Sequence, residues 1–560
     1  MIAVIATELE KEIFIEFFEL FKTPWEFYRE GSFYDIALIT MGRIEEYKTP
    51  EIIGAKLIII YGSNKIYFDE ANEITTVLLH KLSTIEWNEY DVPIYGDLLA
   101  FNDANKPFLK IKNTNQFAAI EINKHNKKIL RIGFDLFQEI HFLLSCGQPV
   151  ENAHIPTLDI HIAILRDFIL RAGITLVEIP PIPAGYNFIV CLTHDVDFIG
   201  IREHVCDYTM WGFVYRALIG SCFKIAHEKS ALKKLIKNWK AVAVLPLVYL
   251  GLVKDFWDDF DRYLDIENEL GSTFYFIPFK NTEGADNTGK KHKLRAVKYD
   301  VQEHRSLIKH LQSTGCEIGL HGIDAWCDAS RGIQELNRIC LETGESSIGV
   351  RMHWLYFDDT SPKLLEETGF LYDSTLGYND AVGFRSGTAQ VFKIPGTERL
   401  LEIPMHIQDT ALFYSSRMGL NEKEAWGHVF DLIKSIQRFG GVMTINWHTR
   451  SLSPERLWDD FYIKLIEMLK TMNVWFATAT QAVKWFDKRR SVSFEKISFK
   501  DDKLTLALSN INNNSGPDLL LRVYWPTHES SNINGFLKRR KFINMPINSN
   551  IETTISLNNI

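Results

Sequence analysis

Residues 188–197 read FIVCLTHDVD, an apolar run that leads directly into two aspartates. An uninterrupted apolar run of this kind predicts a buried strand. Asp195 and Asp197 are two positions apart, so their side chains point the same way on an extended chain. Two such carboxylates repel each other unless a cation or an arginine neutralises them, as when one binds a metal and the other acts as a base. A solvated pair of loop acids is the alternative, and the apolar run argues against it.

Apolar segments alternate with amphipathic ones across residues 188–488. The expected strands include STFYFIPF, CEIGLH, SIGVRMH, LEIPMH and VMTINWH, and the expected helices include RSLIKHLQSTG and SPKLLEETG. These helices end in glycine, as a helix C-cap does. The alternation predicts βα units around a parallel sheet. Seven or eight units favour a (β/α)7–8 barrel of the α/β class over an open, doubly wound sheet.

The flanking regions differ from this central one. Residues 1–180 mix short strands with polar turns, a hairpin that turns at Asn123–Asn126, and a helical segment, DLFQEIHFLLS. They predict an N-terminal α/β module of unknown role. Residues 491–560 contain alternating runs such as SFEKISFK and KLTLALSN, which predict a small C-terminal β module.

The composition excludes several classes of protein. The chain has 560 residues, 46% of them hydrophobic, and a net charge of −9, which argues against disorder, fibres and a nucleic-acid partner. None of its seven cysteines lies in a C-x-x-C pair, so a disulfide scaffold or a cysteine-based zinc site is not expected. The N-terminus has no pattern of an export signal, and a cytoplasmic location is expected.

Residues 233–253 combine lysines with the most apolar stretch of the chain, AVAVLPLVYLGLV. That stretch is too short to span a bilayer and contains Pro246. One interpretation is a buried helix with a basic entry. The other is a peripheral contact with the inner membrane.

Ionisable residues end several of the expected strands. His321, Arg351, His353 and His448 occupy such positions, and the carboxyl ends of barrel strands converge on one mouth. Imidazole is a good ligand for divalent metals, arginine can pair with a carboxylate, and a late histidine suits a general acid. A single histidine of this kind is more often structural, so the inference depends on the group.

Aromatic residues follow two of these strand ends. Trp354, Tyr356 and Trp447 are candidates for stacking against a sugar. Packing in the core is the commoner role of such residues and is the alternative.

Five motifs resemble, in order, those of the polysaccharide deacetylase family, the NodB-homology carbohydrate esterases. They are THDVD (193–197), EIGLHG (317–322), VRMHW (350–354), LEIPMH (401–406) and INWHT (445–449). The resemblance covers residues 188–488 and implies a barrel of the NodB-homology type. It also implies a metal-dependent hydrolase that removes N-acetyl, less often O-acetyl, groups from a glycan or a sugar-lipid precursor.

The second motif departs from the family's usual pattern. The family has two metal-binding histidines four positions apart, and here Ala325 follows His321 at that spacing. Asp324 is one candidate for the missing ligand. His353, which stands where the family's arginine motif normally has proline, is the preferred one. The resemblance thus implies that Asp197, His321 and His353 hold a divalent metal, with zinc as the first choice.

The resemblance also implies roles for the remaining residues. The metal would polarise the acetyl carbonyl and make water more acidic, and Asp195 would accept the proton from that water. Arg351 would keep Asp195 ionised. His448 would protonate the leaving amine, with Asp409 orienting it, while the metal and a backbone N–H stabilise the oxyanion.

Two other functions remain open at this stage. A catalytically silent barrel that binds glycan fits the missing second histidine, but it has no evident need for an acid–base set. A metal amidohydrolase of small cyclic amides would require a deep, narrow pocket.

Overall fold

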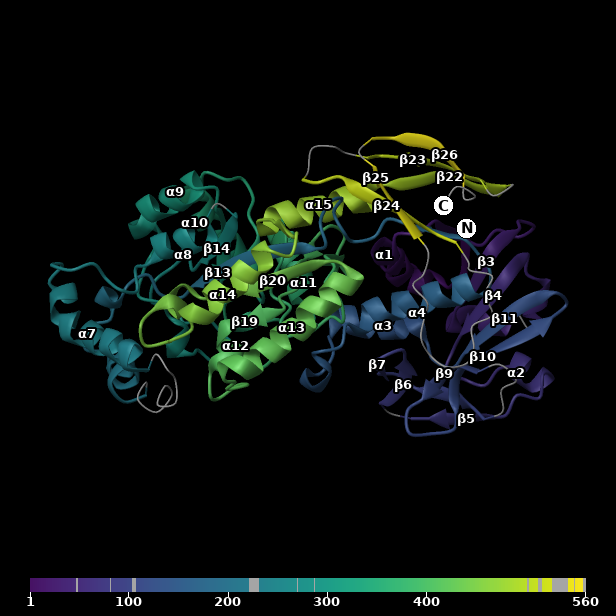
Figure 1. The fold of residues 1–560 in the computed structure, drawn as a ribbon, viewed down its shortest axis with the longest axis horizontal. Helices are drawn as coiled ribbons and strands as arrows, with labels where there is room; N and C mark the ends of the chain where they lie inside the picture. The colour runs from purple at the N-terminus through teal and green to yellow at the C-terminus, as the bar shows by residue number, and fades with distance from the viewer. Residues whose placement is uncertain are drawn as a thin grey trace.

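The structure is a computed structural model of the chain. It describes residues 1–46, 49–80, 82–102, 107–220, 231–268, 270–286, 288–500, 503–511, 516–525, 542–547 and 549–556. A curled parallel sheet with its helices and a large N-terminal sheet lie side by side along the long axis, and the C-terminal strands lie over the N-terminal part (Figure 1).

The central part is the predicted (β/α) barrel. Its sheet has the order β16-β15-β14-β13-β20-β19, and the neighbours along this path pair in parallel. Single parallel bridges from Asp373 to Val350 and to Glu402 extend the curl beyond β16. The strands are β13 (Ile189–Val196), β14 (Ser272–Phe276), β15 (Glu317–Gly322), β16 (Val350–Met352), β18 (Leu401–Glu402), β19 (Ile407–Gln408) and β20 (Val442–Asn446).

Amphipathic helices cover the outside of this sheet, as the sequence pattern predicts. Two of them end at a glycine with a left-handed backbone, Gly344 (φ 79°) and Gly369 (φ 92°), a conformation that other residues adopt at a cost. The helices are α8 (Phe260–Glu267), α9 (Arg305–Ser313), α10 (Ala329–Thr343), α11 (Ser361–Thr368), α12 (Asp409–Phe413), α13 (Glu422–Phe439), α14 (Asp459–Lys470) and α15 (Ala479–Ser491).

The N-terminal part is an eleven-stranded mixed sheet. The predicted hairpin is confirmed as β10 (Phe117–Lys124) paired antiparallel with β11 (Lys127–Ile132), and the predicted helix as α3 (Leu136–Ser145). The other strands on the path are β1 (Ile2–Ile5), β2 (Trp25–Phe27), β3 (Tyr34–Ile39), β4 (Ala55–Tyr61), β6 (Ser83–Trp87), β7 (Tyr90–Ile94) and β9 (Pro107–Ile111). Helix α4 (Thr157–Arg171) is buried on nearly all sides, with Asp159 accepting hydrogen bonds from Thr388 and Gln390 of the barrel.

The C-terminal part forms two small antiparallel sheets. One contains β22 (Ser493–Lys500), β23 (Lys503–Ser509) and β26 (Ile551–Ser556). The other contains β24 (Leu519–Tyr524) and β25 (Phe542–Ile547) and is completed by β12 (Leu176–Glu178). Residues 526–541 of this predicted module lie outside the described residues. The boundaries at 180, 188 and 491 stay a prediction.

A long insertion follows β13 and carries the apolar stretch. It contains α5 (Tyr208–Tyr215), a π-helical turn (Arg216–Gly220) and α7 (Ala231–Tyr249). One side of α7 packs through Ala241, Leu245 and Val248 against a small core of its own. The other side is exposed, so the expectation of a buried helix is wrong for half of its surface, because the insertion offers too little core to cover it.

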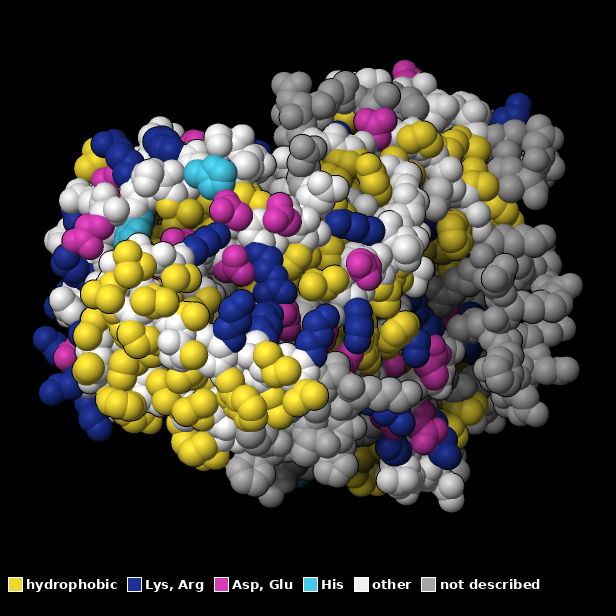
Figure 2. Space-filling model, turned by 60° about the vertical axis from the view of Figure 1, so that its left-hand side comes forward, with side chains coloured by type: hydrophobic (Ala, Val, Ile, Leu, Met, Phe, Trp, Pro, Cys, Tyr) yellow, Lys and Arg dark blue, Asp and Glu magenta, His cyan; other side chains and the backbone are white. Residues whose placement is uncertain are grey.

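The insertion lies at the end of the molecule opposite the N-terminal sheet (Figure 1). The face that comes forward in Figure 2 carries a broad hydrophobic area bordered by lysine and arginine side chains. Among the helices of the described ranges, none is both long and apolar enough to cross a membrane.

Candidate metal centre and active site

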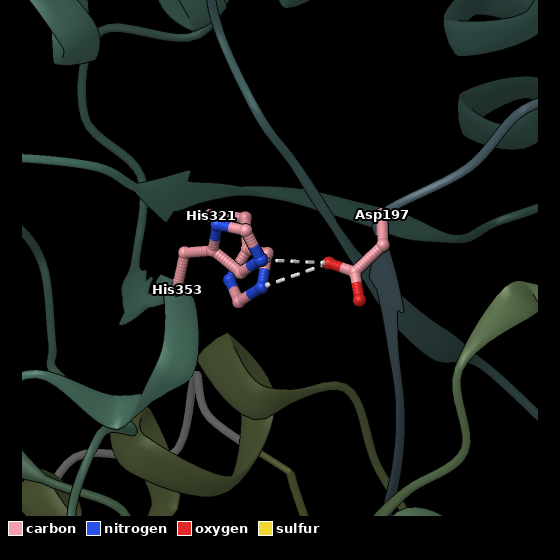
Figure 3. A group of neighbouring side chains, drawn as sticks. All are labelled: Asp197, His321 and His353. Atoms are coloured by element: carbon pink, nitrogen blue, oxygen red, sulfur yellow. Dashed lines mark ion pairs between the residues drawn. The ribbon is translucent and has the colours of Figure 1, made fainter. Parts of the chain in front are cut away.

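Asp197, His321 and His353 converge at the carboxyl end of the parallel sheet (Figure 3). Asp197 follows the last residue of β13, His321 is the penultimate residue of β15, and His353 follows β16. One ligand atom from each lies within 4.8 Å of the others. The Asp197 carboxylate oxygen Oδ1 is 3.5 Å from His321 Nε2 and 3.3 Å from His353 Nε2.

The hydrogen bonds and the burial of these three side chains suit the binding of a cation. His321 Nδ1 lies 2.9 Å from the Arg351 carbonyl, so Nδ1 carries a proton and the opposite ring nitrogen, Nε2, is the one that faces Asp197. Burial lowers the pKa of His353 to about 3, which keeps that imidazole neutral. Asp197 Oδ1 is buried and has no hydrogen-bond donor among the described residues. Two imidazole nitrogens and a carboxylate oxygen that face one another are a set of ligand atoms that fits a divalent cation.

Asp324, the alternative third ligand, is engaged elsewhere. Its carboxylate accepts hydrogen bonds from Arg331 Nη1 at 2.6 Å and from the Ala285 N–H at 2.9 Å. It is absent from the convergent group, and His353 is the residue that the geometry adds to Asp197 and His321.

Asp195 lies beside the metal centre and is held by two other side chains. Arg351 Nη1 donates to its Oδ1 at 3.0 Å, and Asn446 Nδ2 donates to its Oδ2 at 2.8 Å. Burial by itself raises the pKa of Asp195, but electrostatic attraction to its neighbours His321 and Arg351 outweighs burial and lowers that pKa overall. Asp195 is therefore an ionised carboxylate, 3.7 Å from His321 Nε2, in the form that a base requires.

His448 faces the same centre from the end of β20. Its Nε2 lies 3.8 Å from Asp197 Oδ2, and its Nδ1 lies 2.7 Å from Asp409 Oδ1. Burial opposes the charged form, but Asp409 outweighs it and raises the pKa of His448 to about 10. Asp409 is fully buried and also accepts from the His448 N–H. The pair therefore presents a protonated imidazole to the centre.

These groups open into a cavity of about 270 Å³, near the lower end of the usual range for small-molecule sites. Trp354 lines this cavity and is 38% exposed. Tyr356 does not line it and instead packs behind Trp354 and against Arg295. Trp447 is fully buried and stacks on Tyr462 of α14. The positions of Tyr356 and Trp447 favour the core-packing alternative for both rings, and their contact with substrate stays a prediction.

Sequence reasoning missed four polar residues of the cavity region. Asn446 lies two residues before His448 on the same strand, and that spacing could have indicated it. Arg417, Arg450 and Arg456 line the cavity from loops that follow α12 and β20. Nothing in their local sequence signals this position, because it depends on how two loops fold back over the barrel mouth.

No protein-family model matches the chain, and no curated protein matches it. Similar solved structures include a protein from Mycobacterium smegmatis assigned as a polysaccharide deacetylase, at 20% identity and a TM-score of 0.34, covering 56% of this chain and 96% of that one. They also include the catalytic domain of a peptidoglycan N-acetylglucosamine deacetylase from Eubacterium rectale (11% identity, TM-score 0.24, 54% and 93% covered). A third is the allantoinase PuuE (15% identity, TM-score 0.32, 55% and 92% covered). Deacetylases, the class that the five motifs resemble, are thus among the similar structures, and we argue the chemistry from the side chains of this chain.

Proposed function

We propose that the protein is a metal-dependent deacetylase that hydrolyses an N-acetyl group on a glycan. One observation carries the proposal: two imidazoles and a carboxylate converge beside a second carboxylate that an arginine keeps ionised. The donor set of one oxygen and two nitrogens suits zinc. A divalent cation in this centre supplies a Lewis acid that polarises an acetyl carbonyl and makes water more acidic.

The chain's own residues then divide the proton transfers between them. Asp195 accepts the proton of the attacking water, since it is ionised and close to the metal ligands. Arg351 and Asn446 hold both of its oxygens, so the carboxylate does not rotate away. His448 donates the proton of its Nε2 to the leaving amine, and Asp409 fixes the opposite nitrogen. An amine and acetate leave the site.

The alternatives fit the same cavity less well. A protein that only binds glycan has no use for a protonated His448 on Asp409 or for an ionised Asp195 on Arg351. An amidohydrolase of cyclic amides would use the same metal and base. Trp354, a half-exposed ring at the cavity wall, favours a sugar, since a flat aromatic face stacks on a pyranose.

Acetate release tests the proposal directly. Purified protein is incubated with a panel of N-acetylated oligosaccharides, with and without a chelator, and its metal content is measured. We expect acetate release that the chelator abolishes and added zinc restores. His353→Ala should lose the metal and the activity together. His406→Ala is the control, because this buried histidine of the same barrel is no part of the centre. Full metal content in His353→Ala would show that the ligand set is wrong.

We further propose that the exposed side of the insertion contacts an anionic bilayer. Helix α7 contains four lysines and no acidic residue, and Lys233 and Lys240 are exposed. Tyrosine and tryptophan are enriched at membrane interfaces, and lysines attract anionic headgroups. On monomeric proteins, a broad exposed apolar area such as the one on this insertion marks an interaction site. Its large exposed side chains are Tyr208, Trp211, Tyr215, Ile219, Leu232, Ile236, Trp239, Leu247, Leu250 and Leu252.

Vesicle sedimentation tests this contact. The protein should partition to vesicles of phosphatidylglycerol and phosphatidylcholine and less to phosphatidylcholine alone. Leu250→Glu combined with Leu252→Glu, both 71% exposed, should lower partitioning about tenfold or more. Leu341→Glu on α10, also exposed, is the control. A wild-type dimer that the double variant dissociates, together with no vesicle binding, would assign the surface to a second copy of this chain instead.

A further inference from the structure

The cavity at the candidate metal centre is also lined by arginines, which together are called the arginine wall. Arg417, Arg450 and Arg456 line it. The guanidinium groups of Arg417 and Arg456 lie 5.6 and 4.9 Å from the centre of the same ring, that of Tyr414. Two cations on one ring at a cavity wall form a small, well-defined patch of positive charge.

Few carboxylates balance this patch. Arg450 is paired with the buried Glu455 at 3.1 Å. Arg417 reaches only Asp380, at 4.0 Å, and that side chain is largely exposed. For Arg456, no carboxylate of the described ranges lies within ion-pair distance. Within the described ranges, the patch therefore holds about two positive charges, those of Arg417 and Arg456, that no close carboxylate neutralises.

A further arginine adds to the imbalance. Arg216 of the insertion is half-buried, and its Nε has no hydrogen-bond partner among the described residues. Burial and the charge of Arg456 lower the pKa of Arg216. Burial and the same Arg456 charge lower the pKa of Arg450 to about 9. Such repulsion between buried cations is relieved when an anion binds between them.

The three aspartates of the cavity region are not free to serve as that anion. Asp195 is paired with Arg351, and Asp409 with His448. Asp197 belongs to the candidate metal centre, where a cation would take up its charge. None of these three carboxylates is available to the arginine wall, so a bound ligand with negative charge would complete it.

We propose that the substrate is an acetylated sugar that carries a phosphate ester, and that Arg417 and Arg456 bind this phosphate. The proposal rests on the deacetylase function above and names its substrate class. A phosphate monoester has about −1.5 to −2 charges near pH 7, which matches the two unbalanced guanidinium groups, whereas a carboxylate supplies one. The planar guanidinium also donates two parallel hydrogen bonds to phosphate oxygens.

Binding measurements on the zinc-loaded protein test the subsite without relying on turnover. N-acetylglucosamine 1-phosphate should bind at least about tenfold more tightly than N-acetylglucosamine, since each charge-assisted pair contributes strongly. Arg456→Gln and Arg417→Gln should each remove most of this advantage, and Arg456→Lys should retain part of it. Arg399→Gln, an exposed arginine that does not line the cavity, should leave it unchanged.

The outcomes separate this proposal from the function on which it rests. Equal affinity for the two sugars, or an advantage that survives in both glutamine variants, overturns the phosphate subsite. Equally tight binding of N-acetylmuramic acid assigns the wall to a carboxylate, and orthophosphate binding that the sugar does not improve assigns it to a free anion; either result overturns the proposal. Tight, arginine-dependent binding with no acetate release from any acetylated sugar upholds the subsite and rejects the deacetylase.

Discussion

Two buried aspartates on the barrel sheet, Asp195 and Asp373, have opposite ionisation. Asp195 is the penultimate residue of β13 and pairs with Arg351 at 3.0 Å, and its pKa is lowered. Asp373 bridges β16 and β18, and its nearest ionisable neighbour is Glu402. Burial raises the pKa of Asp373 to about 6. Burial, to which the charge of Asp373 adds, raises the pKa of Glu402 well above its usual value.

The comparison shows that burial alone does not determine whether a carboxylate can act as a base. Both side chains are almost completely inaccessible to solvent. A cation beside Asp195 compensates for its lost hydration, whereas a second acid beside Asp373 does not, so Asp373 and Glu402 share a proton. Arg351 lies on β16, and Asp373 bridges to the same strand from its other side. The acid pair is therefore one strand beyond the arginine that neutralises Asp195.

The largest expected effect comes from neutralising Asp195. Asp195→Asn removes the base but keeps the shape and the hydrogen bond from Arg351, so acetate release should fall about 10²–10⁴-fold while bound zinc is retained. Asp373→Asn is the matched control, because Asp373 already shares a proton and has no contact with the centre. Its activity should stay within about twofold of wild type. Loss of activity in both variants would show that the readout reports folding and not the base.

Much of this arrangement follows from the sequence. The strands and helices of residues 188–488 are predicted because each buries an apolar run or an apolar helix face, which leaves a periodic pattern. The convergence of Asp197, His321 and His353 follows from parallel strands that end at one edge. The resemblance already favours His353 as the replacement for the histidine missing at Ala325, since His353 stands where the family's motif normally has proline, and the structure brings it to Asp197 and His321.

Other features could not be predicted, since they depend on contacts between distant segments. Residues 371–375, LYDST, have the pattern of a strand, yet in the described structure Asp373 alone of them forms β-bridges, one to Val350 and one to Glu402. Trp447 belongs to a motif but faces α14, where Phe461 and Tyr462 enclose it. The arginine wall and the pairing of β12 with β24 involve residues far apart in the chain.

A smaller effect, on the free energy of unfolding, should follow from removing the arginine that neutralises Asp195. Arg351→Met leaves Asp195 buried without its partner, which costs about 3–5 kcal/mol in the free energy of unfolding. Asp195→Asn combined with Arg351→Met should recover part of this loss, because no buried charge then remains unpaired. Urea unfolding of the four proteins in this cycle gives the coupling energy. A double variant that is less stable than Arg351→Met alone would contradict the ion pair as the source of the effect.

The smallest effect concerns the acid pair and its dependence on pH. A raised pKa of Asp373 means that the folded state holds a proton that the unfolded chain releases, so this contribution to stability is present below about pH 4. It is lost as the pH rises through about 6. Glu402→Gln replaces the second acid with an amide that donates to Asp373 and leaves an acceptor for the Leu376 N–H. The variant should match wild type at pH 4 and exceed it by about 1–3 kcal/mol at pH 8. Urea unfolding at several pH values measures this difference, and a constant difference across the range would mean that Asp373 and Glu402 do not share a proton.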